Sequence, residues 1–179
     1  MASRRDTRTE ILRALREVLT ESGPKGATLE AVAARAGVSK GGLLYHFGTK
    51  EALFEGLLDH LRTMSTQEVA DAGDHPGGIV AAYLAGSLVA QDEFTRALVA
   101  CLGLLGTPGV DVEGAVGDAL GAWTATLEGA VGDPVRARLV QLVGDGLYLR
   151  ALCGQTTDNV DAAVVGALVA TSARHPFVS

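Results

Sequence analysis

Cysteine is scarce in this sequence, with two residues among 179. Cys101 and Cys153 lack the paired spacing of a zinc site or of a disulfide framework. We therefore predict no metal, no cofactor and a cytoplasmic location. Two buried cysteines that act as small hydrophobic residues are the commoner case, and a redox-sensing pair is the alternative.

The sequence also lacks long apolar runs. The uncharged stretches 76–91 and 97–110 fall short of the roughly 18 apolar residues that a membrane span needs, and both contain Gly and Pro. In the apolar stretch 11–19, charged residues interrupt what would have to be the core of a signal peptide. We therefore expect neither a membrane protein nor an exported one.

Motifs of several enzyme classes are missing. The sequence contains no H-E-x-x-H, no P-loop and no G-x-G-x-x-G pattern, and none of its four histidines has carboxylate and nucleophile neighbours at an interpretable spacing. The chain is therefore predicted not to be an enzyme. A small-molecule carrier or interaction module that does not bind DNA is a further alternative, which would share every feature of the C-terminal part.

Positive charge is scarce overall, because 15 Lys and Arg stand against 21 Asp and Glu, a formal net charge of −6. Residues 1–64 nevertheless carry ten Lys and Arg against eight Asp and Glu, whereas residues 65–179 carry five against thirteen. DNA binding needs local positive charge. The acidic residues 65–179 would be repelled by the phosphates, so the protein would approach DNA with residues 1–64. The asymmetry divides the chain near Met64 but does not alone establish a nucleic-acid partner.

Apolar residues recur at three- and four-residue spacing along most of the chain, and no convincing strand alternation occurs. This pattern predicts an all-α fold of about nine helices, with a first domain in residues 1–64 and a second in residues 65–179. The expected helices cover about 7–21, 28–36, 39–47, 49–64, 79–90, 94–105, 112–131, 134–153 and 158–173.

The most informative segment, residues 28–50, reads TLEAVAARAGVSKGGLLYHFGTK. Two short helices joined by residues 36–38 predict a helix-turn-helix at about 28–47, because Gly37 permits the sharp turn between them. This arrangement leaves the outer face of the second short helix free to enter a DNA major groove.

Polar, aromatic and glycine residues of this segment suit contact with DNA. Hydroxyl and ammonium groups can reach phosphates or base edges, the amides at a helix start can hold a phosphate, and glycine lets a backbone approach closely. The predicted DNA-binding residues are Thr28, Ser39, Lys40, Gly41, Gly42, Leu44, Tyr45, His46 and Lys50.

Residues 8–64 resemble the DNA-binding domain of the TetR family of transcriptional regulators. The resemblance is carried by A-G-V-S-K-G at 36–41, Y-H-F at 45–47 and T-K-E-A-L at 49–53. The family pattern usually has Thr and Tyr where this chain has Gly42 and Leu44. The three motifs imply the family's helical fold, including its three-helix DNA-binding domain.

The C-terminal part resembles the family only in general pattern, although D-G-L-Y-L-R at 145–150 is similar to the eighth helix of members that sense lipophilic drugs. The resemblance implies a homodimer formed by the last two long helices and a ligand pocket among the middle helices. It also implies a repressor that leaves a palindromic operator when the ligand binds.

Charged residues are few between residues 77 and 110, where only Asp92, Glu93 and Arg96 occur. A cavity walled by these helices would have few groups able to bind a polar molecule, so we expect a small lipophilic or amphipathic effector. The residues predicted to line its site are Leu57, Leu61, Met64, Tyr83, Trp123, Leu127 and Tyr148. For Trp123, an ordinary place in the core is an equal alternative.

Overall fold

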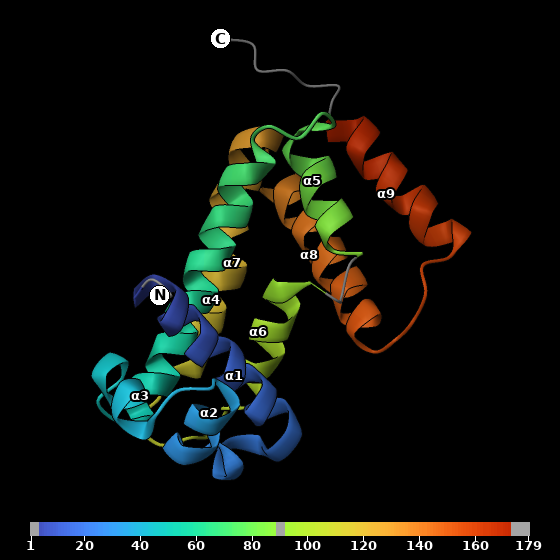
Figure 1. Ribbon diagram of the computed structural model, residues 1–179. Coiled ribbons are helices and arrows are strands. Elements are labelled where there is room, and N and C mark those ends of the chain that lie inside the picture. Colours follow the sequence, from blue (N-terminus) through green and yellow to red (C-terminus); the bar gives the residue numbers. More distant parts are fainter. Residues whose placement is uncertain (1–3, 89–91, 173–179) are drawn as a thin grey trace. The chain divides into compact units, whose positions relative to one another are not determined.

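The computed structural model describes residues 4–88 and 92–172, and this part of the chain contains nine helices and no strand (Figure 1). The predicted all-α fold is confirmed. None of the described helices is both long and apolar enough to cross a membrane. The helices are α1 (Arg4–Gly26), α2 (Leu29–Arg35), α3 (Lys40–His46), α4 (Lys50–Ala72), α5 (Gly78–Gly86), α6 (Glu93–Leu102), α7 (Val112–Val131), α8 (Pro134–Leu152) and α9 (Asn159–Ser172).

Side-chain caps fix where four of these helices begin. The hydroxyls of Thr28, Ser39 and Thr49 accept hydrogen bonds of 3.1, 3.0 and 3.0 Å from backbone N–H groups in the first turns of α2, α3 and α4. The carboxylate of Asp133 accepts two such bonds, of 2.9 and 3.0 Å, at the start of α8. Because these N–H groups have no partner within their helices, the caps stabilise each start. The four starts agree with those expected from the sequence.

Helix α1 extends past its expected end at about residue 21. Gly23 has φ 65° and ψ −176°, which is not helical, so α1 is two helical pieces joined at a kink. The residue that follows is Pro24, which has no N–H to continue the hydrogen-bond ladder. A short turn then closes with a 3.2 Å hydrogen bond from Ala27 N to Gly23 O. The regular part of the helix therefore stops where the Gly-Pro pair predicts it.

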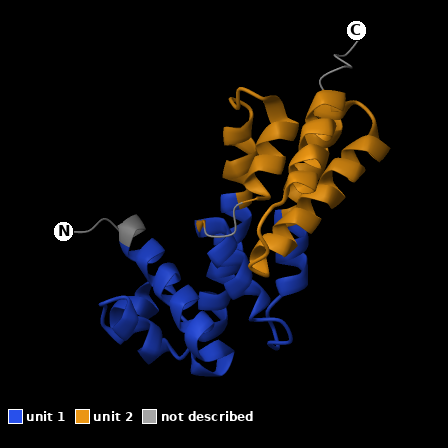
Figure 2. Ribbon diagram, turned by 90° about the vertical axis from the view of Figure 1, so that its right-hand side faces the viewer, with its two compact units in different colours: residues 1–64, 93–119 blue, residues 65–92, 120–179 orange. Residues whose placement is uncertain are grey.

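Backbone contacts divide the chain into two compact units, which Figure 2 shows in two colours. We call residues 1–64 and 93–119 the N-terminal unit, and residues 65–92 and 120–179 the C-terminal unit. Helices α4 and α7 each run from one unit into the other. One boundary between the units falls after Met64, and residues 93–119 group with the N-terminal unit. The domains expected at residues 1–64 and 65–179 stay a prediction.

A buried arginine explains why α6 groups with the N-terminal unit. Arg16 on α1 is 7% exposed, and its guanidinium donates to the backbone oxygen of Glu93 at 3.1 Å. The same guanidinium lies 2.5 Å from the Glu93 carboxylate. Since Glu93 is the first residue of α6, both contacts hold the start of this helix on α1.

Leucine side chains form the centre of the N-terminal unit. Leu15 on α1 and Leu57 and Leu61 on α4 have no exposed surface, and neither do Val32 on α2 and Leu43 on α3. Each such side chain contributes about 1.5 to 3 kcal/mol on leaving water. The two short helices are therefore anchored by few buried residues, Val32 and Ala33 on α2 and Leu43 on α3.

A second core lies within the C-terminal unit. It joins Tyr83 and Leu84 on α5, Leu127 and Val131 on α7, and Val140 on α8. Helix α5 packs against both α8 and α9.

Candidate DNA interface and effector site

The turn between α2 and α3 depends on Gly37. This residue has φ +67°, a left-handed conformation that a side chain would strain. The next residue, Val38, donates its N–H to the oxygen of Ala33 at 3.0 Å, which closes the turn. With Val32 and Leu43 buried behind it, this segment forms the predicted helix-turn-helix.

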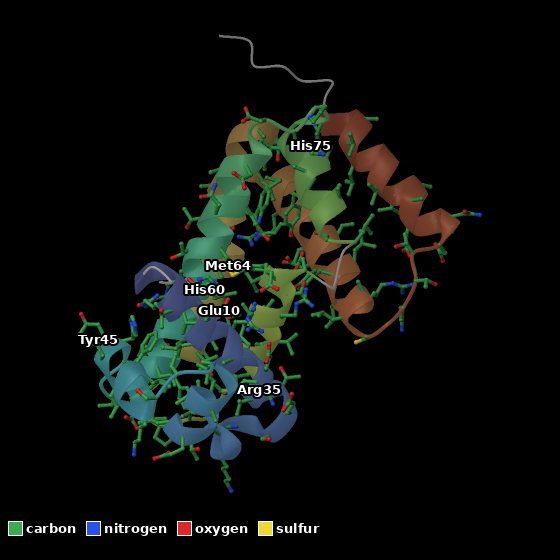
Figure 3. All side chains as sticks on the ribbon, in the orientation of Figure 1. Glu10, Arg35, Tyr45, His60, Met64 and His75 are labelled. Carbon is green, nitrogen blue, oxygen red and sulfur yellow. The ribbon has the colours of Figure 1, made fainter. Side chains whose placement is uncertain are left out.

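Helix α3 presents an open face. Tyr45 is 68% exposed, and Figure 3 shows its side chain pointing away from the helix. The ring of His46 lies edge-on to that of Tyr45, with centroids 5.4 Å apart. Of the predicted DNA-binding residues, Gly42, His46 and Lys50 are half-buried, and Thr28, Ser39, Lys40, Gly41, Leu44 and Tyr45 are exposed.

Both predicted lysines already have partners within the chain. The ammonium of Lys40 lies 2.5 Å from the carboxylate of Glu30. That of Lys50 donates to the backbone oxygen of Pro24 at 2.7 Å and lies 5.2 Å from the ring centroid of Phe54. The contact of Lys50 with Phe54 follows the four-residue spacing of one helix, whereas those with Glu30 and Pro24 join separate helices and have no sign in the spacing along the sequence. An ammonium group has three donors, so either lysine can still bind a phosphate.

Residues 37–41 also spell G-x-S-x-G, the pattern of the nucleophile elbow in α/β-hydrolases. That elbow follows a β-strand, and no strand occurs in residues 4–88 or 92–172. Here the hydroxyl oxygen of Ser39 accepts the N–H of Gly42 and caps α3. The pattern is therefore part of the helix-turn-helix.

The structure brings together three of the residues predicted to line an effector site. In the C-terminal unit, the rings of Tyr83 and Trp123 have centroids 5.1 Å apart, and Leu127 belongs to the same core. Tyr148 is half-buried on α8 in this unit. The remaining three, Leu57, Leu61 and Met64, belong to the N-terminal unit, where the two leucines are core residues.

Polar groups that sequence reasoning missed surround Tyr83. Its hydroxyl has one hydrogen to donate, and two acceptor oxygens lie within reach of it: a carboxylate oxygen of Asp145 at 2.8 Å and the backbone oxygen of Gln141 at 3.1 Å. Burial, followed by the hydrogen bond to Asp145, raises the pKa of Tyr83. A β-carbon at Gly144 would lie 2.3 Å from the Tyr83 ring, so this glycine lets the ring lie against α8. The carboxylate of Asp145 is thus held beside an aromatic pair.

A surface hollow of about 390 Å³ lies in the N-terminal unit. Its lining includes three arginines and three glutamates, which does not match the apolar site expected for the effector. The lining residues are Arg13, Arg16, Glu17, Thr20, Glu21, Glu93 and Arg96.

The two cysteines differ in their surroundings. Cys101 is buried, which raises the pKa of its thiol to about 12, whereas Cys153 is exposed. Both are free thiols. The interpretation as buried hydrophobic residues therefore holds for Cys101 and is wrong for Cys153.

Glu68, on the C-terminal half of α4, is a half-buried carboxylate that also escaped the sequence analysis. Burial, followed by the negative charges of Asp92 and Asp71, raises the pKa of Glu68 to about 7. An unfolded chain would have the ordinary value near 4.5. The folded protein therefore binds a proton at Glu68 more tightly than the unfolded chain does.

This difference predicts a pH-dependent stability. Between about pH 4.5 and 7 the folded state holds the extra proton, so stability falls as the pH rises through this window. Above pH 7 the ionised Glu68 destabilises the fold, and we expect Glu68→Gln to restore on the order of 1 to 2 kcal/mol there. Thermal melting of wild type and variant at pH 5 and pH 8 checks this expectation.

The matched control is Glu128→Gln, which removes an exposed carboxylate of the same unit. The control is expected to melt like the wild type at both pH values. A stabilisation by Glu68→Gln that is the same at pH 5 and pH 8 would show that proton binding at Glu68 is not its cause.

Two family models match this chain. The first, described as bacterial regulatory proteins of the tetR family, covers residues 11–57. The second, described as the tetracyclin repressor-like C-terminal domain, covers residues 77–173, which is more than half of the chain. Together they include both compact units.

Individual proteins are similar to this chain over different lengths. An HTH-type transcriptional repressor of Mycobacterium tuberculosis, Rv3405c, is 38% identical over 64 residues, which are 36% of this chain and 34% of the relative. The chain thus matches about a third of the length of this curated relative.

Two solved structures share the fold over most of the chain. A putative transcriptional regulator from Pseudomonas aeruginosa PAO1 has a TM-score of 0.72 at 23% identity and covers 97% of this chain and 93% of its own. The regulator FadR from Bacillus subtilis, in complex with stearoyl-CoA, has a TM-score of 0.63 at 18% identity. The match covers 91% of this chain and 98% of FadR. These two likenesses show the fold, and the family models, one of which covers more than half of the chain, establish that the chain belongs to the tetR family of bacterial regulatory proteins.

Proposed function

We propose that this protein is a transcriptional repressor that binds a near-palindromic operator as a homodimer and leaves it when a small amphipathic molecule binds. The observation that carries the DNA-binding part is the open face of α3. It holds an aromatic side chain, Tyr45, that is 68% exposed, and an exposed ammonium at Lys40. A recognition helix uses such groups to contact base edges and phosphates in the major groove.

The homodimer is proposed from the exposed faces of α8 and α9. On α8, apolar side chains at spacings of three, four and seven residues lie open to solvent, and on α9 none of the described side chains is buried. A monomer seldom leaves such an apolar surface uncovered. The exposed apolar residues on these helices are Val135, Leu139, Leu142, Leu149, Val160 and Val164.

The effector is proposed to be mainly apolar, with room for a positive charge. Trp123 and Tyr83 supply aromatic surface, and Asp145 supplies a carboxylate next to them. The stearoyl-CoA bound by FadR also has a long apolar chain, which supports an apolar effector for this protein. Helix α4 is the proposed link to DNA, because it begins at Lys50, next to the helix-turn-helix, and continues into the C-terminal unit.

The contacts with DNA are tested by three substitutions, each measured on an operator duplex and on a random duplex. Lys50→Ala is expected to weaken binding to both equally, because a phosphate contact carries no sequence information. Lys40→Ala and Tyr45→Phe are expected to change the preference among base sequences by about 1 to 3 kcal/mol if they remove a contact to a base edge. Fluorescence anisotropy on duplexes with single base changes measures both effects.

Lys50→Ala also removes the hydrogen bond to Pro24, so its melting temperature is recorded in parallel. Equal losses on every duplex for all three variants would show that Lys40 and Tyr45 only position the protein. That outcome would assign base readout to other residues.

A further inference from the structure

One acidic residue lies within the helix-turn-helix, in the first turn of α2. Its carboxylate, on Glu30, lies 2.5 Å from the ammonium of Lys40. The other cation of the two short helices, Arg35, pairs with Glu17 and Glu21 of α1 at 3.1 and 2.5 Å. Every Lys and Arg of α2 and α3 thus has an acidic partner, and the motif offers little uncompensated positive charge to DNA.

The position of Glu30 has an ordinary structural benefit, since a carboxylate in the first turn of a helix interacts favourably with the helix dipole. That benefit does not need Lys40. The hydrogen bond from Lys40 is nevertheless the largest cause of a lowered pKa at Glu30. The helix dipole therefore does not explain why Glu30 lies so close to Lys40, a predicted DNA-binding residue.

Binding to random-sequence DNA comes almost entirely from cations that neutralise phosphates and release counterions. For Lys40 to act in this way, it must either leave Glu30 or bring that carboxylate close to the phosphates. Phosphates and a carboxylate repel each other within a Debye length, which is about 8 Å at physiological salt. The Glu30–Lys40 ion pair thus opposes the contact between Lys40 and a DNA phosphate, which would form on DNA of any sequence.

We infer that Glu30 is a specificity-determining residue, which competes with DNA phosphates for Lys40 and holds the lysine ammonium in one direction, toward a base edge. A lysine held in one direction loses less side-chain entropy when it meets the correct base, whereas a phosphate contact must either break the pair or bring the Glu30 carboxylate close to the phosphates. Glu30 therefore weakens binding to random DNA more than binding to the operator. This inference rests on the proposed DNA-binding function.

Glu30→Gln tests the inference, because it removes the charge and keeps the size of the side chain. We expect its affinity for a random duplex to rise by about 3-fold, and its affinity for a selected operator to rise less. The plot of log affinity against log salt for random DNA should steepen by about 0.9, the value for one additional phosphate contact. The matched control is Glu113→Gln, which removes an exposed carboxylate from the first turn of α7.

A double-mutant cycle shows whether Glu30 acts through Lys40. In a Lys40→Ala background, Glu30→Gln is expected to change random-DNA affinity no more than Glu113→Gln does. If Glu30→Gln raises both affinities equally, or has its full effect without Lys40, the inference is wrong. A wild-type protein that binds no DNA would instead contradict the proposed function, so the two failures are distinguishable.

Discussion

Val164→Glu is expected to convert the protein into monomers that have lost operator binding. Val164 lies on α9 and is 40% exposed, on the apolar face proposed to form the dimer. A glutamate there would be buried without a partner charge, which costs several kcal/mol on association. Because one monomer contacts only one half-site, we expect operator affinity to fall by at least about 100-fold. Sedimentation and anisotropy measure the two effects.

Leu142→Glu, on the exposed face of α8, provides a second variant with the same expected result. Leu168 is less suitable for this test, because it packs against the core of the C-terminal unit. A substitution there could unfold the unit, and loss of the dimer would then not report on the interface. The control is Val99→Glu on α6, since Val99 is 41% exposed and thus matches Val164 in type and exposure. Dimers that survive both test substitutions would place the interface elsewhere.

The second large effect is expected on effector binding. A compound that raises the melting temperature should quench the fluorescence of Trp123 and release operator DNA. Trp123 is the sole tryptophan of the chain, and its ring lies 5.1 Å from that of Tyr83. Any change in tryptophan emission therefore reports on this part of the C-terminal unit. Cationic dyes, antibiotics and fatty acyl compounds form the screening set.

The size of the release is limited by the difference in effector affinity between the two states of the protein. Typical couplings would lower operator affinity by about 5- to 150-fold, and operator DNA must weaken effector binding by the same factor. Trp123→Phe removes the optical signal and also part of the aromatic surface proposed to bind the effector, so we expect release of DNA to need a higher concentration of the compound than in the wild type. Tight binding of a compound with neither quenching nor release would contradict both the site and its coupling to α4.

Local signals in the sequence predict the helices well because they act within one turn. Thr28, Ser39 and Asp133 identify helix starts through hydrogen bonds to N–H groups two or three residues away. Likewise, Gly37 identifies the turn because its backbone conformation strains any other residue. Such features need no knowledge of the rest of the fold.

Contacts between distant segments could not be predicted in this way. The hydrogen bonds from Tyr83 to Asp145 and from Lys50 to Pro24 join residues that are far apart in the sequence. No pattern of residue spacing predicts them, because each depends on how helices and turns pack together. The same holds for the buried Arg16, whose contacts with Glu93 join α6 to α1 in the N-terminal unit. The sequence therefore identified the helix-turn-helix but not the partners of its lysines.

The most direct test of this account is a selection of genomic fragments bound by the wild-type protein, followed by titration of the enriched sequence at several salt concentrations. We predict a near-palindrome with half-sites about 34 Å apart, one helical turn of DNA. Affinity for it should fall steeply as salt rises, by about 10³- to 10⁵-fold between 50 and 200 mM if six to ten phosphates are bound. Selection of no sequence, together with binding that does not respond to salt, would contradict the DNA-binding function and favour a small-molecule carrier.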